Sequence, residues 1–247
     1  MLASSTVGAG ERVALLHGFT QTKESWLHLA SNLSSKFEMI AIDLPNHGDS
    51  TDISFNLETG AHAIVEIADV ANYIGYSLGA RFCLTAALAH REKVKRLVLI
   101  SGTAGIEDKV DRQTRIATDE DLANHIEQIG VPQFITEWLA QPMFAGLSGQ
   151  NSQRELRLGN TAIGLSSSLR LCGAGKQQPS WSRLSELDMP VLVIAGADDL
   201  KFVAVAKRLV DAIGDNAQLR IIAHSGHSPH LEQRKNTEDV LNKFLSN

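Results

Sequence analysis

Cysteine, aromatic residues and long hydrophobic runs are all scarce in this sequence of 247 residues. Only Cys83 and Cys172 are present, which argues against the disulfide framework of a small secreted domain. No apolar stretch approaches the roughly 20 residues that span a membrane. The N-terminal residues MLASSTVGAG lack the basic and apolar regions of a signal peptide. We therefore expect a cytoplasmic protein without a membrane partner.

An excess of positive charge is missing as well, because the formal net charge is −5. This balance argues against a nucleic-acid partner, although it leaves room for a small cationic pocket. The hydrophobic content of 43% and the charged content of 21% are ordinary for a globular domain. The length suffices for one sizeable α/β domain with a buried core. A monomer and a small homo-oligomer both remain open.

The stretch from Gly75 to Gly79, GYSLG, matches the nucleophile-elbow pattern G-x-S-x-G. Residues 72–76 before Ser77 are predicted to form a strand, and residues 78–90, rich in Ala and Leu, a helix. In such an elbow the flanking glycines allow the strand and helix to approach closely, so that the serine hydroxyl is exposed. Ser77 is therefore the predicted nucleophile; the alternative is a tight turn with an idle serine.

Short apolar runs alternate with helical patterns over most of the chain, which predicts a parallel, doubly wound α/β sheet. Such sheets bind ligands beyond the carboxyl ends of their strands. The predicted strands are residues 12–16, 37–44, 72–76, 95–101, 190–195 and 218–222, and the helices between or after them are residues 25–33, 61–68, 78–90 and 237–245.

Residues 103–183 contain no convincing strand. Helices are predicted over residues 118–129, where Thr118 and Asp121 have capping-box spacing, from Pro132 onward, and over residues 150–158 and 161–172. A run of helices inserted into an α/β pattern predicts a cap over the ligand end of the sheet. We expect a single domain whose core comprises residues 1–103 and 186–247 and whose cap comprises residues 104–185.

A serine nucleophile needs a histidine base and an orienting carboxylate, which in this type of fold follow the serine in the order acid, then histidine. Asp199 comes just after the strand at 190–195, and His227 after the strand at 218–222, so both are expected at the same end of the sheet as Ser77. Asp198 is an alternative acid, and His224 and His230 are alternative bases. Alone, each residue would more often be a helix cap or a structural histidine.

Two backbone N–H groups are the predicted oxyanion donors, that of Leu78 after the nucleophile and that of Phe19 in the loop after the first strand. His17 in the same loop is expected to be structural. Arg81 lies four residues after Ser77 on the same helix face, where its charge opposes the helix dipole. Either a local carboxylate or an anionic ligand should compensate that charge.

Five arginines follow in the predicted cap. Arginines there would normally be solvated, but the planar guanidinium is the preferred clamp for carboxylates. They are Arg112, Arg115, Arg154, Arg157 and Arg170.

The whole sequence resembles the α/β-hydrolase superfamily through HGFT at 17–20, DLPNHGDS at 43–50, GYSLGAR at 75–81, GADDLKF at 196–202 and SGHSPHLE at 225–232. Within it, the sequence is similar to the family of 2-succinyl-6-hydroxy-2,4-cyclohexadiene-1-carboxylate (SHCHC) synthases of menaquinone biosynthesis. The segments that carry this finer resemblance are Arg81, LISGTAGIED at 99–108, EWLAQPMFAGL at 137–147 and DLKF at 199–202. The sequence departs from the superfamily pattern at Ala80 and Asn46, where glycine is usual.

The resemblance implies that Arg81, Arg115 and Arg157 bind substrate carboxylates, with Arg112 a competitor for Arg115, and that Tyr76 and Trp138 line the pocket. It implies pyruvate elimination from a small carboxylate-bearing substrate, with no cofactor and no metal. The rival functions are a carboxylesterase or thioesterase, a C–C bond hydrolase and a non-catalytic ligand receptor.

Overall fold

The computed structural model describes residues 1–246, which fold around one seven-stranded sheet of order β1-β3-β2-β4-β5-β6-β7. Strand β1 pairs antiparallel with β3, and the other neighbouring strands run parallel, which confirms the doubly wound α/β prediction. The strands are β1 (Ser4–Val7), β2 (Glu11–Leu16), β3 (Phe37–Ile42), β4 (Ala71–Tyr76), β5 (Val94–Ile100), β6 (Val191–Gly196) and β7 (Ala217–Ile222).

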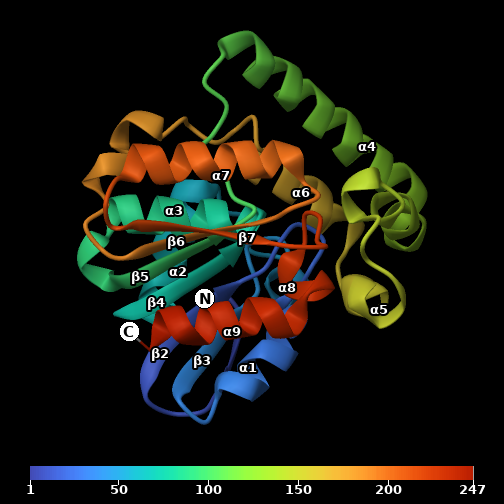
Figure 1. Cartoon of the computed structure of the whole chain (residues 1–247). Helices are drawn as coiled ribbons and strands as arrows, with labels where there is room; N and C mark the ends of the chain where they lie inside the picture. The colour runs from blue at the N-terminus through green and yellow to red at the C-terminus, as the bar shows by residue number, and fades with distance from the viewer. Residues whose placement is uncertain (247) are drawn as a thin grey trace.

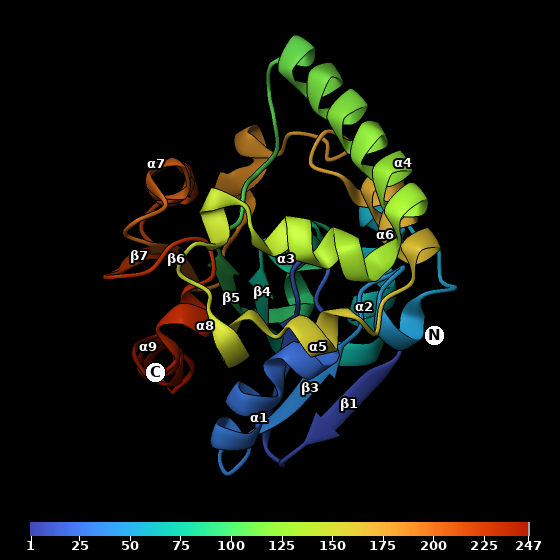
Figure 2. The ribbon, with the colours of Figure 1, turned by 90° about the vertical axis from the view of Figure 1, so that its right-hand side faces the viewer.

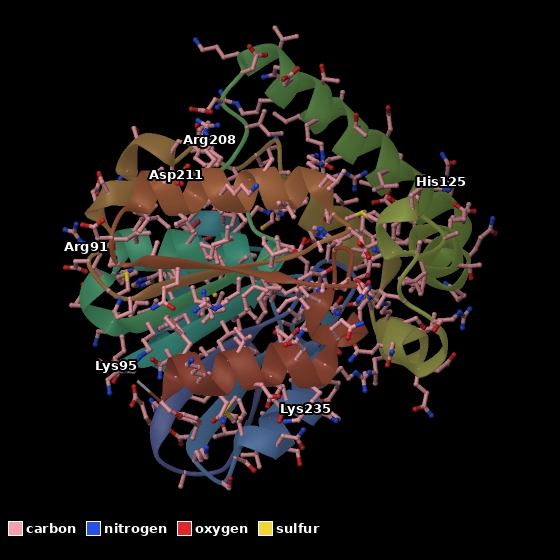
Figure 3. The ribbon with its side chains drawn as sticks, viewed as in Figure 1. Arg91, Lys95, His125, Arg208, Asp211 and Lys235 are labelled. Carbon is pink, nitrogen blue, oxygen red and sulfur yellow. The ribbon has the colours of Figure 1, made fainter. Side chains whose placement is uncertain are left out.

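Helices cover both faces of the sheet (Figure 1). On one face lie α2 (Leu57–Ala68), α3 (Leu78–Ala89) and α7 (Leu200–Ile213), and on the other lie α1 (Leu27–Leu33) and α9 (Arg234–Leu245). Each face of the sheet therefore has its own hydrophobic core. Successive residues of the buried strands point to opposite faces, so that Tyr73 packs in the core under α2, α3 and α7, and Ile74 in the core under α1 and α9. Charged side chains such as Arg208 on α7 and Lys235 on α9 point away from the sheet (Figure 3).

Strand β1 and helix α7 were absent from the sequence prediction, as was the short α8 (Pro229–Glu232). Strand β1 has the sequence SSTV and is mostly exposed at the edge of the sheet, so no apolar run marks it. Helix α7 does carry a helical pattern, because its buried residues Ala206, Leu209 and Ile213 recur at helical spacing.

Helix α4 (Lys109–Leu139) begins well before the predicted residue 118. Its N-cap is Asp108, whose side chain accepts hydrogen bonds from two backbone N–H groups, so the predicted cap at Thr118 is wrong. The helix breaks at Gly130 (φ 74°, ψ 167°), and Pro132 lies in the first turn of the second half, as predicted.

The predicted helix over 150–158 is also wrong in its extent. Gln153 adopts a left-handed conformation (φ 53°) and separates a 3₁₀ turn at Gly149–Ser152 from the short α5 (Arg154–Arg157). Helix α6 (Ala162–Cys172) agrees with the prediction and is capped by the Thr161 side chain.

Helices α4, α5 and α6 lie at the carboxyl end of the parallel strands (Figures 1 and 2), and α4 and α6 share a small core of their own. No strand interrupts the described residues between β5 and β6. The division at residues 104–185 stays a prediction. Among residues 1–246, no helix is long and apolar enough to cross a membrane.

Candidate active site

Ser77 lies in the turn between β4 and α3 with a positive φ of 51°. The neighbouring glycines are required by close backbone approach. A Cβ at Gly75 would lie 2.3 Å from the Gly79 carbonyl oxygen, and one at Gly79 would lie 2.1 Å from that of Leu16. The GYSLG sequence therefore folds as the predicted elbow, with Ser77 at the N-terminus of α3.

His227 lies between Ser77 and Asp199. Its Nε2 atom is 3.3 Å from the Ser77 Oγ atom, and its Nδ1 atom is 2.8 Å from Asp199 Oδ2. Asp199 also caps α7, since its Oδ1 atom accepts the Phe202 N–H. Burial acts to raise the pKa of Asp199, but hydrogen bonds from His227 and the Phe202 amide outweigh it and hold that pKa below its ordinary value.

The alternative acid and bases lie elsewhere. Asp198 is exposed, and so is His224 in the loop after β7. His230 is buried and packs on the ring of Tyr76 with 4.3 Å between centroids. Of these residues, the structure brings only Asp199 and His227 together with Ser77.

The loop that carries His227 is held from both sides. Glu232 accepts the N–H of Gly226 at 2.7 Å and that of Ser228 at 2.9 Å, so one carboxylate bridges the two residues that flank His227. On the other side, the Ser101 hydroxyl donates to the His227 carbonyl oxygen at 2.8 Å. Neither Glu232 nor Ser101 was singled out from the sequence.

The two predicted oxyanion donors have no hydrogen-bond acceptor within residues 1–246, and both Phe19 and Leu78 line the cavity at Ser77. The peptide that contains the Phe19 N–H is fixed at its other end, because the Gly18 carbonyl accepts from His17 Nδ1 at 2.8 Å and from the Gln21 N–H at 3.1 Å. In a trans peptide the N–H points opposite to the C=O, so the hydrogen bonds at the Gly18 carbonyl also set the direction of the Phe19 N–H.

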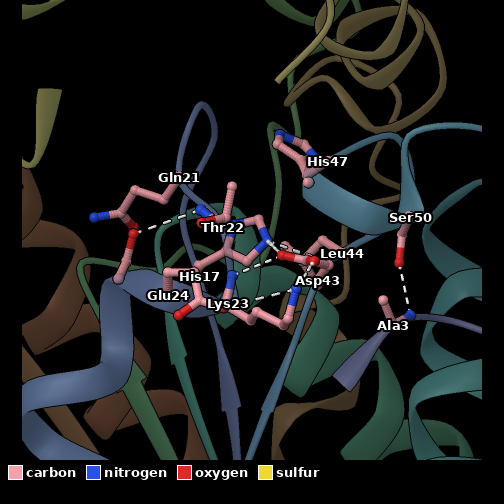
Figure 4. A network of polar contacts seen from close by, with 12 residues as sticks. Ala3, His17, Gln21, Thr22, Lys23, Glu24, Asp43, Leu44, His47 and Ser50 are labelled. Carbon is pink, nitrogen blue, oxygen red and sulfur yellow. Dashed lines mark hydrogen bonds and ion pairs between the residues drawn. The ribbon is translucent and has the colours of Figure 1, made fainter. Parts of the chain in front are cut away.

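His17 can donate from Nδ1 because its Nε2 atom accepts the Leu44 N–H at 3.0 Å (Figure 4). Burial lowers its pKa to about 3, so the ring stays neutral in this tautomer. The structural role expected for His17 is thus to hold the loop. Near this loop, Lys23 Nζ lies 2.8 Å from Oδ2 of the buried Asp43.

A cavity of about 700 Å³ lies beside Ser77 and His227, between the sheet and the cap. The predicted substrate-binding residues all line it, namely Tyr76, Arg81, Arg115, Trp138 and Arg157. Phe19 and Trp138 pack edge to face with 5.2 Å between their ring centroids. The Tyr76 hydroxyl lies 2.7 Å from Ser228 Oγ, and burial raises the pKa of Tyr76. One wall is therefore aromatic.

Arg81 is buried in the first turn of α3, and its Nη1 atom donates to the Cys172 carbonyl at 2.7 Å. It forms no ion pair with a carboxylate in the described part of the chain. Burial lowers its pKa to about 10, so the side chain remains charged at neutral pH. Of the two compensations that the sequence left open, a direct carboxylate partner is not found there.

Arg115 lines the cavity, whereas its competitor Arg112 does not. The Arg115 Nε atom donates to Asp119 Oδ1 at 2.7 Å, an acid that the sequence analysis did not identify. Because Asp119 occupies only Nε, the outer edge of the guanidinium is left to a ligand.

Arg157 is only 1% exposed and lies in α5. It donates from Nε to the Ser152 carbonyl at 2.9 Å and from Nη1 to the Thr20 hydroxyl, while its buried Nη2 atom has no partner within residues 1–246. Burial lowers its pKa to about 10. A buried guanidinium that lines a cavity and keeps an unpaired donor lacks a compensating charge, which an anion in the cavity would supply.

The other two cap arginines are directed to surface acids: Arg154 pairs with Glu155, and Arg170 pairs with Glu120 and Glu127. The cation Lys201, by contrast, lines the cavity and was not predicted to do so. No group of three or more His, Cys, Asp or Glu side chains among residues 1–246 is arranged to hold a metal ion.

Comparison with known proteins supports a common origin with one enzyme group. The chain is 30% identical to the 2-succinyl-6-hydroxy-2,4-cyclohexadiene-1-carboxylate synthase of Serratia proteamaculans, over 100% of this chain and 99% of that protein. A Bacillus subtilis protein that carries the same name provisionally is 33% identical over 99% of this chain and 94% of its own length.

The structure of MenH from S. aureus superimposes with a TM-score of 0.92 and 26% identity, covering 98% of this chain and 97% of MenH. An esterase from Thermogutta terrifontis, at 20% identity and a TM-score of 0.84, shares the fold and covers 99% of this chain and 93% of its own. The family model described as the alpha/beta hydrolase fold matches residues 11–233. The chain therefore belongs to the α/β-hydrolase family.

Proposed function

We propose that this protein is a lyase that eliminates pyruvate from 2-succinyl-5-enolpyruvyl-6-hydroxy-3-cyclohexene-1-carboxylate and yields SHCHC. The observation that carries the proposal is the cationic wall of the cavity. Arg81 and Arg157 are buried in the lining of the cavity at Ser77 without a carboxylate partner in the described chain, and Arg115, which pairs with Asp119, lines the same cavity. A substrate with several carboxylates supplies the missing anions, whereas a simple ester does not.

The proposed chemistry begins with proton transfer. His227, oriented by Asp199, takes the proton of the Ser77 hydroxyl, and Ser77 removes the ring proton next to the succinyl carbonyl. The negative charge that develops on this carbonyl oxygen is stabilised by the N–H groups of Phe19 and Leu78.

The electron pair then moves through the ring. The ring double bond shifts and the C–O bond to the enolpyruvyl group breaks. The leaving enolate then takes up the proton that His227 accepted from Ser77, so that pyruvate forms and His227 becomes neutral again. No water is consumed and no acyl-enzyme forms, in contrast to a hydrolase. The arginines hold the carboxylates so that the ring proton faces Ser77.

The test is pyruvate release from the cyclohexene precursor, generated in situ, with a p-nitrophenyl ester measured in parallel. We expect release by the wild type, loss of it in Ser77→Ala, and no change in the control Ser31→Ala, which changes an exposed position on α1. Arg81→Ala should raise KM for the precursor. Fast ester cleavage without pyruvate would instead favour an esterase or thioesterase, and water incorporated into the product would favour a C–C hydrolase. Tight binding of the precursor without turnover would favour a receptor.

A further inference from the structure

Thr20 has an unusual backbone conformation for its residue type. Its φ is +68°, in the left-handed region that β-branched residues rarely adopt, and its side chain is fully buried. It is the third residue of a turn closed by the hydrogen bond from the Gln21 N–H to the Gly18 carbonyl, a position that normally calls for glycine or asparagine. Such a conformation persists only where surrounding groups enforce it.

The groups that hold Thr20 belong to the cap. Asn160 donates from Nδ2 to the Thr20 carbonyl at 2.8 Å, and Arg157 donates to the Thr20 hydroxyl. Asn160 is itself fully engaged, because the same nitrogen donates to the Arg157 carbonyl at 3.0 Å and Oδ1 accepts the Gly48 N–H at 3.0 Å. Asn160 is 6% exposed and does not line the cavity, so it acts through other residues.

The contact at Thr20 reaches the oxyanion donor through two peptide planes. The Thr20 carbonyl and the Gln21 N–H belong to one peptide group, and the Gly18 carbonyl and the Phe19 N–H belong to a second, which the first contacts through a hydrogen bond. Asn160 fixes the first carbonyl, the Gln21 N–H at the opposite end donates to the Gly18 carbonyl at 3.1 Å, and the Phe19 N–H points the other way.

We propose that Asn160 is a positioning residue for the oxyanion hole, through which the cap aims the Phe19 N–H at the reacting oxygen. The inference rests on the proposed function only in taking Phe19 as an oxyanion donor. Arg157 lies in the same connection, because it lines the cavity and its Nη1 atom donates to the Thr20 hydroxyl. A substrate carboxylate bound by Arg157 is thereby linked to the oxyanion loop.

The test compares Asn160→Ala and Asn160→Asp with the control Asn216→Ala. Aspartate keeps the shape and the acceptor for the Gly48 N–H but removes the donor to Thr20. Asn216 is a matched control because it also donates from Nδ2 to two backbone carbonyls, at 2.6 and 2.9 Å, on a loop that does not line the cavity. Two readouts are used, kcat and KM for pyruvate release and the rate at which a fluorophosphonate labels Ser77.

Removal of an oxyanion donor lowers rates by about 100- to 1,000-fold, and a misaimed donor should cost about 10- to 100-fold. We expect both Asn160 variants to lose that much in kcat and in labelling rate while KM stays within about threefold of the wild type. Assays are run well below the lowest melting temperature, so that a loss of folding is not counted.

A labelling rate within twofold of the wild type in both variants, or an equal loss in Asn216→Ala, would overturn the proposal. The labelling rate does not depend on substrate recognition. Failure of the wild type to release pyruvate would therefore refute the proposed reaction, while labelling still decides the role of Asn160.

Discussion

Replacement of Glu232 by glutamine should damage both stability and activity, since one carboxylate accepts the N–H groups on either side of His227. A glutamine side chain can accept with only one of its two terminal atoms. One N–H therefore loses its acceptor and faces an amide NH₂ group instead. Because a hydrogen bond to a charged group contributes about 1.5–3 kcal/mol, Glu232→Gln should lose about 2 kcal/mol of stability, and Glu232→Ala about twice that.

For a domain of this size, about 2 kcal/mol corresponds to a fall in melting temperature of about 4–8 °C. The effect on turnover follows from geometry, since the His227 Nε2 atom already lies 3.3 Å from Ser77 Oγ. A misplacement of about 1 Å can cost about 100-fold in rate. We expect kcat for pyruvate release to fall by about 10- to 100-fold in the glutamine variant.

The assays are thermal unfolding by circular dichroism and pyruvate release coupled to lactate dehydrogenase. Glu66→Gln is the matched control, because Glu66 is exposed on α2, does not line the cavity, and lies 3.5 Å from the equally exposed His62. If Glu232→Gln kept the melting temperature and kcat of the wild type, the argument that Glu232 holds the catalytic loop would be refuted.

Arg157→Met should raise KM for the acidic substrate by about 10- to 100-fold, because one charge-assisted hydrogen bond to a substrate carboxylate is lost. An unchanged KM in steady-state assays would show that Arg157 does not bind the substrate. Asp119→Ala should raise KM through the misplaced Arg115, so it should have no further effect in an Arg115→Ala background; additive effects would show that Asp119 acts separately. Acid should destabilise the protein, because burial lowers the pKa of three histidines to about 3 and their unfolded forms take up protons below about pH 6.5. The three are His17, His47 and His230. The free energy of unfolding, measured with urea, should therefore fall between pH 6.5 and 5 by up to about 2 kcal/mol for each of them. An unfolding free energy that does not change over this pH range would contradict the burial argument.

Local sequence was sufficient for the elbow, the parallel sheet and the order of the candidate triad. Period-2 and period-3.6 patterns report which residues are buried, and strand ends in a parallel sheet fall on one edge. That is why Ser77, Asp199 and His227, far apart in the chain, were predicted to meet. Polar β1 gave no such signal, and the length of α4 was underestimated because its first turns are largely exposed and carry no continuous apolar stripe.

Tertiary structure alone decided which polar groups face one another. Composition alone left the cap arginines equivalent, and only the family resemblance implied Arg115 and Arg157; packing places these two at the cavity and directs Arg154 and Arg170 to surface acids. The contact between Asn160 and Thr20 joins residues 140 positions apart and follows no local period. Local propensity determined the elements, their order and the helix caps, whereas the hydrogen bonds between distant segments depended on long-range packing that no short stretch of sequence encodes.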